Sequence, residues 1–215
     1  MGAATHGEAP PDCRLCPRLA DYRADNRQRH PAYHNAPVPA FGEDQARLLV
    51  VGLAPGLHGA NRTGRPFTGD HAGLLLYQTL HAHGFADRPA SIARDDGLKL
   101  VGCRITNAVR CVPPQNRPET AEVRRCNPYL AAEIAALPPG AAILALGQIA
   151  HAAVLQALGR KPAHHPFAHG ARHPLPDGRT LFDSYHCSRY NTQTGRLTPA
   201  MFHAVFADIR RHLEV

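Results

Sequence analysis

The chain has 215 residues, 44% of them hydrophobic, and its 24 Lys and Arg outnumber its 17 Asp and Glu to give a net charge of +7. The apolar content is ordinary for a globular protein, and the excess positive charge favours a polyanionic partner, of which nucleic acid is the commonest. The sequence does not begin with a secretory pattern, and the longest apolar run, residues 141–146, is far too short to cross a bilayer. We therefore expect one cytoplasmic domain over residues 1–215, with no membrane association and with reduced cysteines.

A polar segment precedes the first expected strand. We expect residues 1–12 to be a flexible lead, and the pair Cys13 and Cys16 follows it. In a reduced compartment such a pair indicates a metal site or a redox site, and no strand precedes it as a redox motif requires. A helix over residues 19–29 and a proline-containing linker over 30–41 lead to the first strand, an apolar run at 48–51.

The segment after this strand, residues 52–70, combines five glycines with several polar side chains. Glycine lets the backbone turn sharply and approach a ligand, and a strand, a glycine loop and a helix in this order are typical of a phosphate- or nucleotide-facing site. The loop is not a triphosphate cradle, because Arg65 and Pro66 stand where such a cradle needs Lys and Ser or Thr. Pro66 also lacks the backbone N–H that would bind a phosphate.

Strands and helices alternate through the rest of the chain. We expect helices over 71–83, 119–137, 149–158 and 198–213, and strands over 100–109, 141–147 and 179–185. This order predicts a parallel sheet covered by helices on both faces. Residues 86–98 are expected to form a charged loop. The segment rich in His and Pro at 160–177 is expected to be a solvated excursion rather than a metal site.

Three polar loops leave the carboxyl ends of the expected strands, at 53–70, 107–118 and 186–196. Ligands of open parallel sheets bind outside these strand ends. We therefore expect one composite site built from the three loops.

Four of the six cysteines form a candidate ligand set: Cys13, Cys16, Cys111 and Cys126. Structural zinc sites usually use two close pairs, whereas here only one pair is close. This arrangement favours an iron–sulfur cluster, with zinc left open as the alternative. Cys103 falls inside an expected strand and is interpreted as a small core residue.

Three segments resemble a known family. They read GLAPGLHGANRTGRPFTGD at 52–70, ITNAVRCVPPQNRP at 105–118 and SYHCSRYNTQTGRL at 184–197. In this order they are similar to the signature motifs of the uracil-DNA glycosylase superfamily, and more narrowly to its family 5 (B-type) enzymes, which carry a 4Fe–4S cluster. The four cysteines fall where the cluster ligands of that family fall, and the resemblance extends from residue 13 to residue 210.

The resemblance implies a three-layer α/β/α sandwich around a central four-stranded parallel sheet. It implies a monofunctional glycosylase of base excision repair that flips uracil out of DNA and hydrolyses its N-glycosidic bond, leaving an abasic site. Excision of other deaminated bases such as hypoxanthine and a structural role for the cluster are implied as well. We expect a monomer. The alternative hypothesis is a catalytically weak nucleic-acid-binding protein of the same fold.

A flipped base needs a stacking face and polar partners inside its pocket. Phe67 is expected to supply the face, because its neighbours are Gly, Pro and Thr rather than core residues. Asn107 matches the family's Asn, and an amide satisfies both the N3–H donor and the O4 acceptor of uracil. The resemblance also assigns Gly52 and Ala54 to substrate binding.

Cleavage leaves negative charge on the base and positive charge on the sugar. His186 matches the motif's His and is expected to donate to the uracil O2. The positions after Gly52 hold Leu53 and Ala54, so the nearest loop carboxylate is Asp70. The resemblance assigns Asp70 the positioning of water, although it is also a suitable N-cap for the next helix.

Polar loop residues are expected to contact DNA phosphates and sugars. The expected residues are Asn61, Arg62, Arg65, Ser188, Arg189 and Asn191. The third motif departs from the family's His-Pro-Ser, because Cys187 replaces the proline that would stiffen the loop entering the minor groove.

Overall fold

The computed structural model describes residues 7–214, and its strands form one six-stranded sheet in the order β1-β3-β2-β4-β6-β5. The four central strands are parallel: β2 (Leu48–Gly52), β3 (Cys103–Asn107), β4 (Ala142–Leu146) and β6 (Thr180–Ser184). Every residue of these strands is buried, as expected for strands covered on both faces. The expected parallel core is confirmed.

Two short strands make the sheet mixed rather than purely parallel. They are β1 (Phe41–Gly42), antiparallel to β3, and β5 (Arg172–Pro174), antiparallel to β6. Strands of two and three residues are too short to show an alternating apolar pattern. The expectation that 160–177 is a solvated excursion is therefore wrong in part, because β5 lies within it and His173 is buried.

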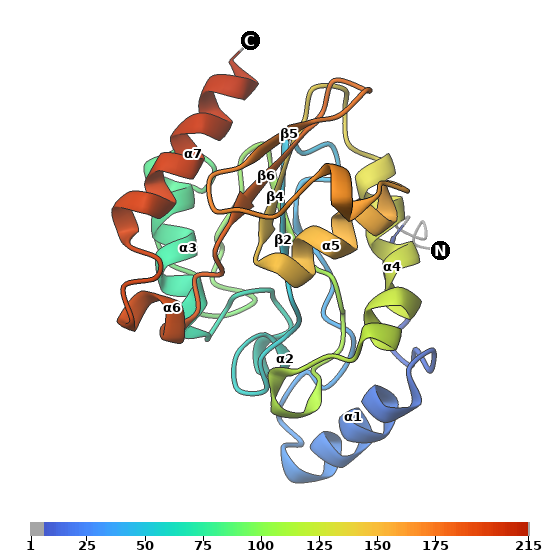
Figure 1. The fold of residues 1–215 in the computed structure, drawn as a ribbon. Helices are drawn as coiled ribbons and strands as arrows, with labels where there is room; N and C mark the ends of the chain where they lie inside the picture. Colours follow the sequence, from blue (N-terminus) through green and yellow to red (C-terminus); the bar gives the residue numbers. More distant parts are fainter. Residues whose placement is uncertain (1–6, 215) are drawn as a thin grey trace.

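Helices cover both faces of the sheet (Figure 1). On one face lie α3 (His71–Ala82) and α7 (Pro199–Leu213), and on the other lie α4 (Thr120–Ala135) and α5 (Gln148–Ala157). Alternate residues of β2 enter opposite cores, with Leu48 and Val50 facing α3 and α7, and Leu49 and Val51 facing α4 and α5. This alternation follows from the period of two along a strand and confirms the three-layer sandwich.

The remaining helices lie in the connecting segments. They are α1 (Pro17–Arg29), α2 (Ala60–Thr63), α6 (Arg189–Gln193) and the 3-10 turns at Pro114–Asn116 and Pro162–His164. In Figure 1, α2 and α6 lie below the sheet, beyond the carboxyl ends of the parallel strands. They shape the loops in which the candidate residues lie.

The expected flexible lead lies partly outside the described residues, at 1–6. Within its described part, Glu8 accepts a hydrogen bond from the Ala40 N–H at 3.1 Å and forms an ion pair with Arg104 at 3.3 Å. This part of the lead is therefore attached to the sheet rather than free. Among the described helices, none combines the length and apolar character that crossing a membrane demands.

Candidate functional site

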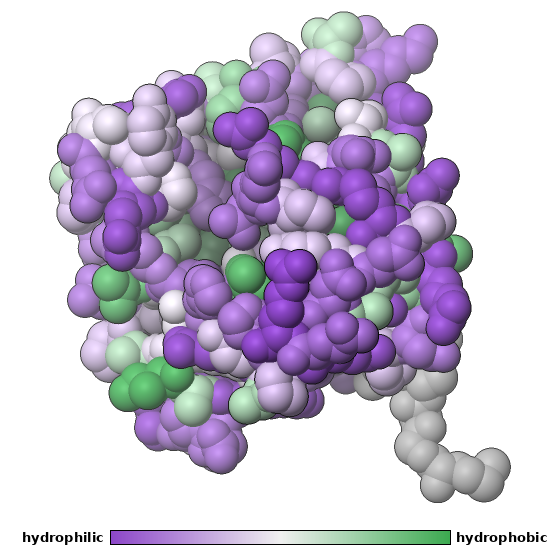
Figure 2. All heavy atoms as spheres, turned by 90° about the horizontal axis from the view of Figure 1, so that it is seen from below, coloured by the Kyte–Doolittle hydropathy of each residue, from purple (hydrophilic) through white to green (hydrophobic). Residues whose placement is uncertain are grey.

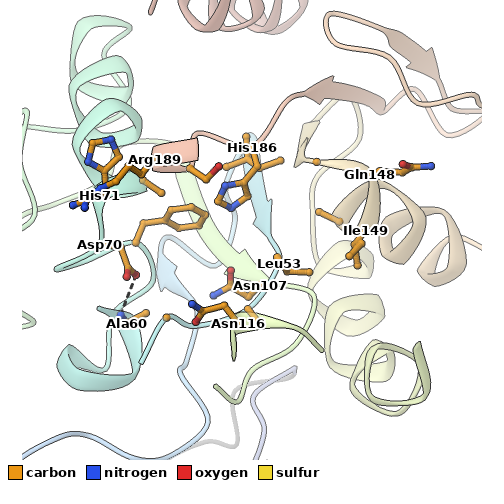
Figure 3. Close-up of a pocket in the computed structure, with 18 residues that line it drawn as sticks. Leu53, Ala60, Asp70, His71, Asn107, Asn116, Gln148, Ile149, His186 and Arg189 are labelled. Atoms are coloured by element: carbon orange, nitrogen blue, oxygen red, sulfur yellow. Dashed lines mark hydrogen bonds between the residues drawn. The ribbon is translucent and has the colours of Figure 1, made fainter. Parts of the chain in front are cut away.

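A cavity of about 680 Å³ opens at the carboxyl ends of the parallel strands, on the face shown in Figure 2. Hydrophilic residues cover most of that face. Residues from all three polar loops line the cavity, as does the start of α5. In Figure 3, Asp70 and His71 lie on one side of it, and Gln148 and Ile149 lie on the other. The topology thus brings together segments that are more than one hundred residues apart in the sequence.

The innermost part of the cavity is formed by two neighbouring strand ends. Gly52 and Asn107 are paired in the parallel register of β2 and β3. A Cβ atom on Gly52 would lie 2.4 Å from Asn107 Oδ1 and 2.6 Å from Phe67 Cζ, so only glycine fits there. The Asn107 side chain forms no hydrogen bond with any other described residue, although the residue is 3% exposed. Its amide is therefore available to a ligand in the cavity.

Phe67 lies in the wall of the cavity in a strained conformation. Its φ of 55° is in the left-handed region, which is uncommon for a non-glycine residue. The surroundings hold it there, because Tyr77 Oη donates to the Pro66 carbonyl at 2.9 Å and Gly73 leaves room for the Phe67 carbonyl. Its ring stacks beside His186, with 5.9 Å between ring centroids.

Asp70 occupies the N-cap position of α3, but its carboxylate does not cap that helix. Asp70 Oδ2 instead accepts a hydrogen bond from the Ala60 N–H at 3.1 Å. A Cβ atom on Gly59 would lie 1.8 Å from Asp70 Oδ1, so glycine makes this arrangement sterically feasible. Burial raises the pKa of Asp70, and the Ala60 N–H and the Arg62 charge oppose that rise. The result is a carboxylate of increased basicity that lines the cavity.

His186 follows β6 and faces the cavity from the third loop (Figure 3). Its backbone carbonyl accepts a hydrogen bond from the Asn191 side chain at 2.8 Å, and Ser188 Oγ caps α6 at the Asn191 N–H. Cys187 beside it is fully buried in the core. Burial lowers the pKa of His186 to about 4, so its imidazole is neutral at neutral pH.

The expected DNA contacts divide into exposed and buried residues. Arg62 and Arg189 are exposed, and Arg189 lines the cavity. Arg65 is 4% exposed and forms an ion pair with Asp96 at 2.8 Å. Asn61 is fully buried. In this structure both side chains are turned into the protein, where Asn61 bonds to Asn35 and Arg65 pairs with Asp96, so we do not propose them as DNA contacts.

The Asn61 side chain is buried because it forms a hydrogen bond with Asn35 inside the protein. Asn61 Nδ2 donates to Asn35 Oδ1 at 3.0 Å, and Asn35 in turn donates to the His30 carbonyl at 2.8 Å. These bonds fasten α2 to the end of α1, so that the loop carrying Asp70 has a fixed support.

Sequence reasoning did not single out several residues that line the cavity, among them Asn116, Gln148 and Ile149. Asn116 has a φ of 56°, in the left-handed region that Asn tolerates better than most residues. The sequence signal for this position was an Asn within a proline-rich loop. Gln148 and Ile149 are exposed at the start of α5. Their position after a strand that ends at the site is the only sequence signal for them.

The four candidate cysteines line a second, small cavity at the contact between α1 and α4. Cys13 and Cys16 precede α1, Cys111 follows β3, and Cys126 lies on α4. Cys103 is buried in β3 as expected and does not line this cavity. Sequence reasoning therefore selected the cysteines that converge.

The four cysteines supply the kind of ligands that an iron–sulfur cluster or a zinc ion requires. Four thiolates around one zinc ion lie about 3.8 Å apart, given Zn–S bonds of about 2.3 Å. Among the described residues, the one group of three or more possible ligands that already lie close enough to share a single ion is elsewhere. Burial raises the pKa of Cys16 to about 11 and that of Cys111 to about 12, so iron or another cation is needed to hold these sulfurs as thiolates.

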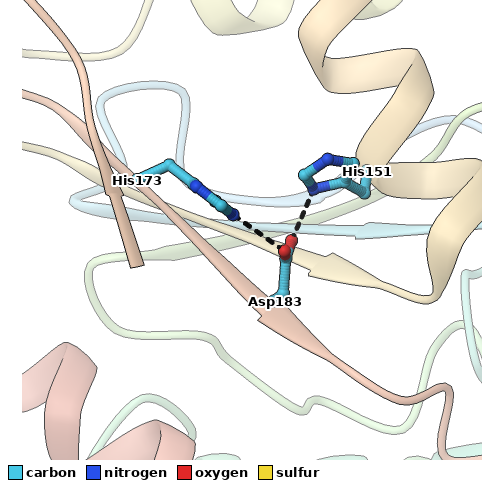
Figure 4. A group of neighbouring side chains, drawn as sticks. All are labelled: His151, His173 and Asp183. Carbon is cyan, nitrogen blue, oxygen red and sulfur yellow. Dashed lines mark hydrogen bonds and ion pairs between the residues drawn. The ribbon is translucent and has the colours of Figure 1, made fainter. Parts of the chain in front are cut away.

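That other group consists of His151 on α5, His173 on β5 and Asp183 on β6 (Figure 4). Asp183 Oδ1 lies 2.7 Å from His151 Nδ1, and Asp183 Oδ2 lies 3.0 Å from His173 Nε2. His151 Nε2 lies 2.9 Å from the His165 carbonyl. These are direct hydrogen-bond distances, and the contacts tie the histidine-rich segment to the sheet.

Comparisons with known proteins agree with the geometry. The family model of the uracil DNA glycosylase superfamily matches residues 39–210. The chain is 49% identical over 204 residues to a type-5 uracil-DNA glycosylase of Thermus thermophilus, covering 93% of each chain. It is 45% identical over 207 residues to a type-5 uracil-DNA glycosylase of Mycobacterium leprae, covering 93% of this chain and 90% of the relative. A type-4 uracil-DNA glycosylase of Pyrobaculum aerophilum is 38% identical over 60% of this chain.

Proposed function

Since the chain belongs to the uracil-DNA glycosylase superfamily, as its three motifs predict, we propose that the cavity at the strand ends is where it hydrolyses the N-glycosidic bond of uracil in DNA. The protein is a hydrolase that excises uracil. The observation that carries the proposal is the presence of Asp70, Asn107 and His186 in one cavity, each with hydrogen-bonding capacity that the protein itself does not use.

Phe67 and Asn107 bind the flipped base in this proposal. The Phe67 ring is held in place by the backbone and supplies the stacking face. The Asn107 amide accepts from uracil N3–H and donates to O4. Gly52 keeps these two side chains in place, because any larger residue would push into both, and Ala54 adds to the lining.

His186 and Asp70 act on the two charges that develop as the bond breaks. The neutral His186 imidazole donates a hydrogen bond to uracil O2, where negative charge accumulates. The Asp70 carboxylate orients the attacking water and stabilises the positive charge on the sugar. The raised pKa of Asp70 increases its affinity for the proton that this water loses.

Arg62 and Arg189 are the residues we propose to contact DNA phosphates. Both are exposed: Arg62 belongs to α2 and its charge acts on Asp70, and Arg189 begins α6 and lines the cavity. Ser188 lines the cavity, whereas the Asn191 amide is already bonded to the His186 carbonyl. Asn191 therefore supports the reaction by fixing the loop, and the Ser188 hydroxyl, which accepts from the Asn191 N–H as the cap of α6, keeps its own proton to donate to the substrate strand.

The width of the cavity and the apolar side chains of Leu53 and Ala54 in its lining support a broader substrate range that includes hypoxanthine. A volume of about 680 Å³ exceeds what a pyrimidine needs, and Leu53 and Ala54 add no polar group that would reject a purine. A duplex with one hypoxanthine, incubated with excess protein and then treated with alkali, tests this. Strand cleavage above that of Asp70→Asn protein is expected, and equal background in both proteins would contradict the broader range.

Cys13, Cys16, Cys111 and Cys126 are the proposed ligands of a structural 4Fe–4S cluster. The iron atoms of such a cluster are coordinated by Cys thiolates, so the cluster would tie α1, the loop after β3 and α4 together. Iron analysis and visible absorption of anaerobically purified protein test the proposal. We further propose a monomer that works in the cytoplasm, where the cysteines stay reduced.

The reaction itself is tested on a labelled duplex that contains one uracil. We expect cleavage of the strand only after alkali, because a monofunctional glycosylase leaves an intact abasic strand. The alternative hypothesis, a catalytically weak DNA-binding protein, predicts a gel shift without alkali-sensitive product.

A further inference from the structure

Arg23 is a buried cation that contacts the four-cysteine group. It lies on α1, seven residues after Cys16, and is 4% exposed. Arg23 Nη1 donates to Cys111 Sγ at 3.2 Å, and Arg23 Nη2 donates to the Cys13 carbonyl at 2.7 Å. One guanidinium group therefore joins the two chain segments that carry these cysteines.

Arg23 has no carboxylate partner. Within residues 7–214, no Asp or Glu oxygen lies within the 4.0 Å that defines an ion pair with it, and its Nε atom has no hydrogen-bond partner. The other buried arginines are paired, since Arg110 and Arg104 both reach Glu133, and Arg65 reaches Asp96. A buried charge without a counter-ion is costly, so the negative charge that compensates Arg23 must come from the cysteine sulfurs and whatever they hold.

The other described donors to the sulfurs are neutral. The Arg110 backbone N–H donates to Cys126 Sγ at 3.3 Å, and the Tyr129 hydroxyl lies 3.9 Å from Cys13 Sγ. Arg124 and Arg125 on α4 are exposed to solvent, which screens their charges. Arg23 is thus the one buried full charge in contact with a cysteine sulfur among the described residues.

We propose that Arg23 is the counter-ion of the anionic cluster held by the four cysteines, and that it stabilises the reduced cluster and its retention. This inference rests on the proposed iron–sulfur cofactor. One-electron reduction adds a negative charge to the cluster without breaking a bond, so a cation that donates to a ligand sulfur favours the reduced state. Loss of that cation therefore shifts the reduction potential to more negative values and weakens the hold on iron.

The test compares three variants of the full chain, purified without oxygen. Arg23→Gln removes the charge, Arg23→Lys keeps it without the fork that reaches both Cys111 and Cys13, and Arg29→Gln removes an exposed charge from the same helix. A dithionite titration monitored by visible absorption gives the potential. Iron release to a chelator gives the retention half-time.

We expect Arg23→Gln to shift the potential to more negative values and to release iron at least several-fold faster, with a smaller change in Arg23→Lys and none in Arg29→Gln. Wild-type potential and retention in Arg23→Gln would overturn the inference. If Arg23→Gln does not assemble, Arg23→Lys decides, and it overturns the inference if both its values equal those of the wild type. Wild-type protein without iron would refute the cofactor itself, and this inference with it.

Discussion

Two groups of histidine and aspartate side chains lie on or beside the same sheet, but they differ in their hydrogen bonding. In the cavity, Asp70 accepts one hydrogen bond from the Ala60 N–H, and the His186 ring forms no hydrogen bond with another described residue. On β5, β6 and α5, Asp183 is bonded through both oxygens to His151 and His173. The first group faces a cavity, and the second is enclosed.

We infer from this difference that unused hydrogen-bonding capacity, rather than residue type, distinguishes the proposed catalytic groups from the structural ones. Asp183 and its two histidines satisfy one another and connect three elements of the fold. Asp70 keeps one oxygen for a ligand, and it does so because glycines surround it. The two groups should therefore respond to substitution in opposite ways.

The largest expected effect on turnover is that of Asp70→Asn. This variant keeps the shape of the side chain and removes the charge that acts on the water and the sugar, so single-turnover excision of uracil should fall about 10³-fold. Quenched-flow or manual sampling with excess enzyme measures it. DNA affinity from fluorescence anisotropy should stay within about threefold of wild type, because removing an interaction specific to the transition state leaves ground-state binding intact.

Gly59→Ala tests the support of Asp70 without changing any charge. Its Cβ would lie 1.8 Å from Asp70 Oδ1, so the carboxylate must move away from the Ala60 N–H. A misplaced catalytic group costs about 10²-fold in rate, and we expect a loss of that size in single-turnover excision. A fully folded Gly59→Ala protein with wild-type rate and pH profile would mean that the position of this carboxylate does not matter.

His151→Ala is expected to affect stability rather than turnover. It leaves Asp183 buried with one partner fewer, which should lower the free energy of unfolding by about 3 kcal/mol. Urea denaturation measures the loss. Folded His151→Ala protein should excise uracil at nearly the wild-type rate, and a large loss of turnover would link this cluster to the chemistry.

The smallest expected effect concerns the pH dependence. Ionised Asp70 is the active form, and burial raises its pKa, so the single-turnover rate should fall on acidification at a pH above the ordinary value for aspartate, 3.8. Burial lowers the pKa of His186 to about 4, so its protonation falls on the same acidic limb, and a variant that acts on Asp70 alone is needed to assign the limb. Arg62→Gln removes a charge that lowers the pKa of Asp70, so the limb should move to higher pH. If the acidic limb of the rate profile does not move in this variant, the limb belongs to the titration of another group.

Much of the fold was predictable because its signals are local. The parallel strands are continuous apolar runs such as 142–146, and the helices between them have glycine or proline at their ends. The edge strands β1 and β5 escaped prediction, because pairing with a neighbour rather than local pattern defines strands of two or three residues.

The site was predictable as a set of loops but not residue by residue. Arg62 and Arg65 belong to the same loop and have the same side chain, yet one is exposed and the other is paired with Asp96. His173 was expected to be solvated, and its burial depends on the pairing of β5 with β6. Such outcomes are decided by tertiary contacts that a single sequence does not display.

The most direct test of the account is a paired measurement on Asp70→Asn and Asp183→Asn, with single-turnover excision and urea unfolding recorded for the same samples. Asp70→Asn should lose about 10³-fold in rate without loss of stability, because its buried charge lacks full compensation. Asp183→Asn should unfold at lower urea concentration while its folded form keeps a rate within about threefold of wild type. Near-normal excision by Asp70→Asn, or a folded but inactive Asp183→Asn, would contradict it.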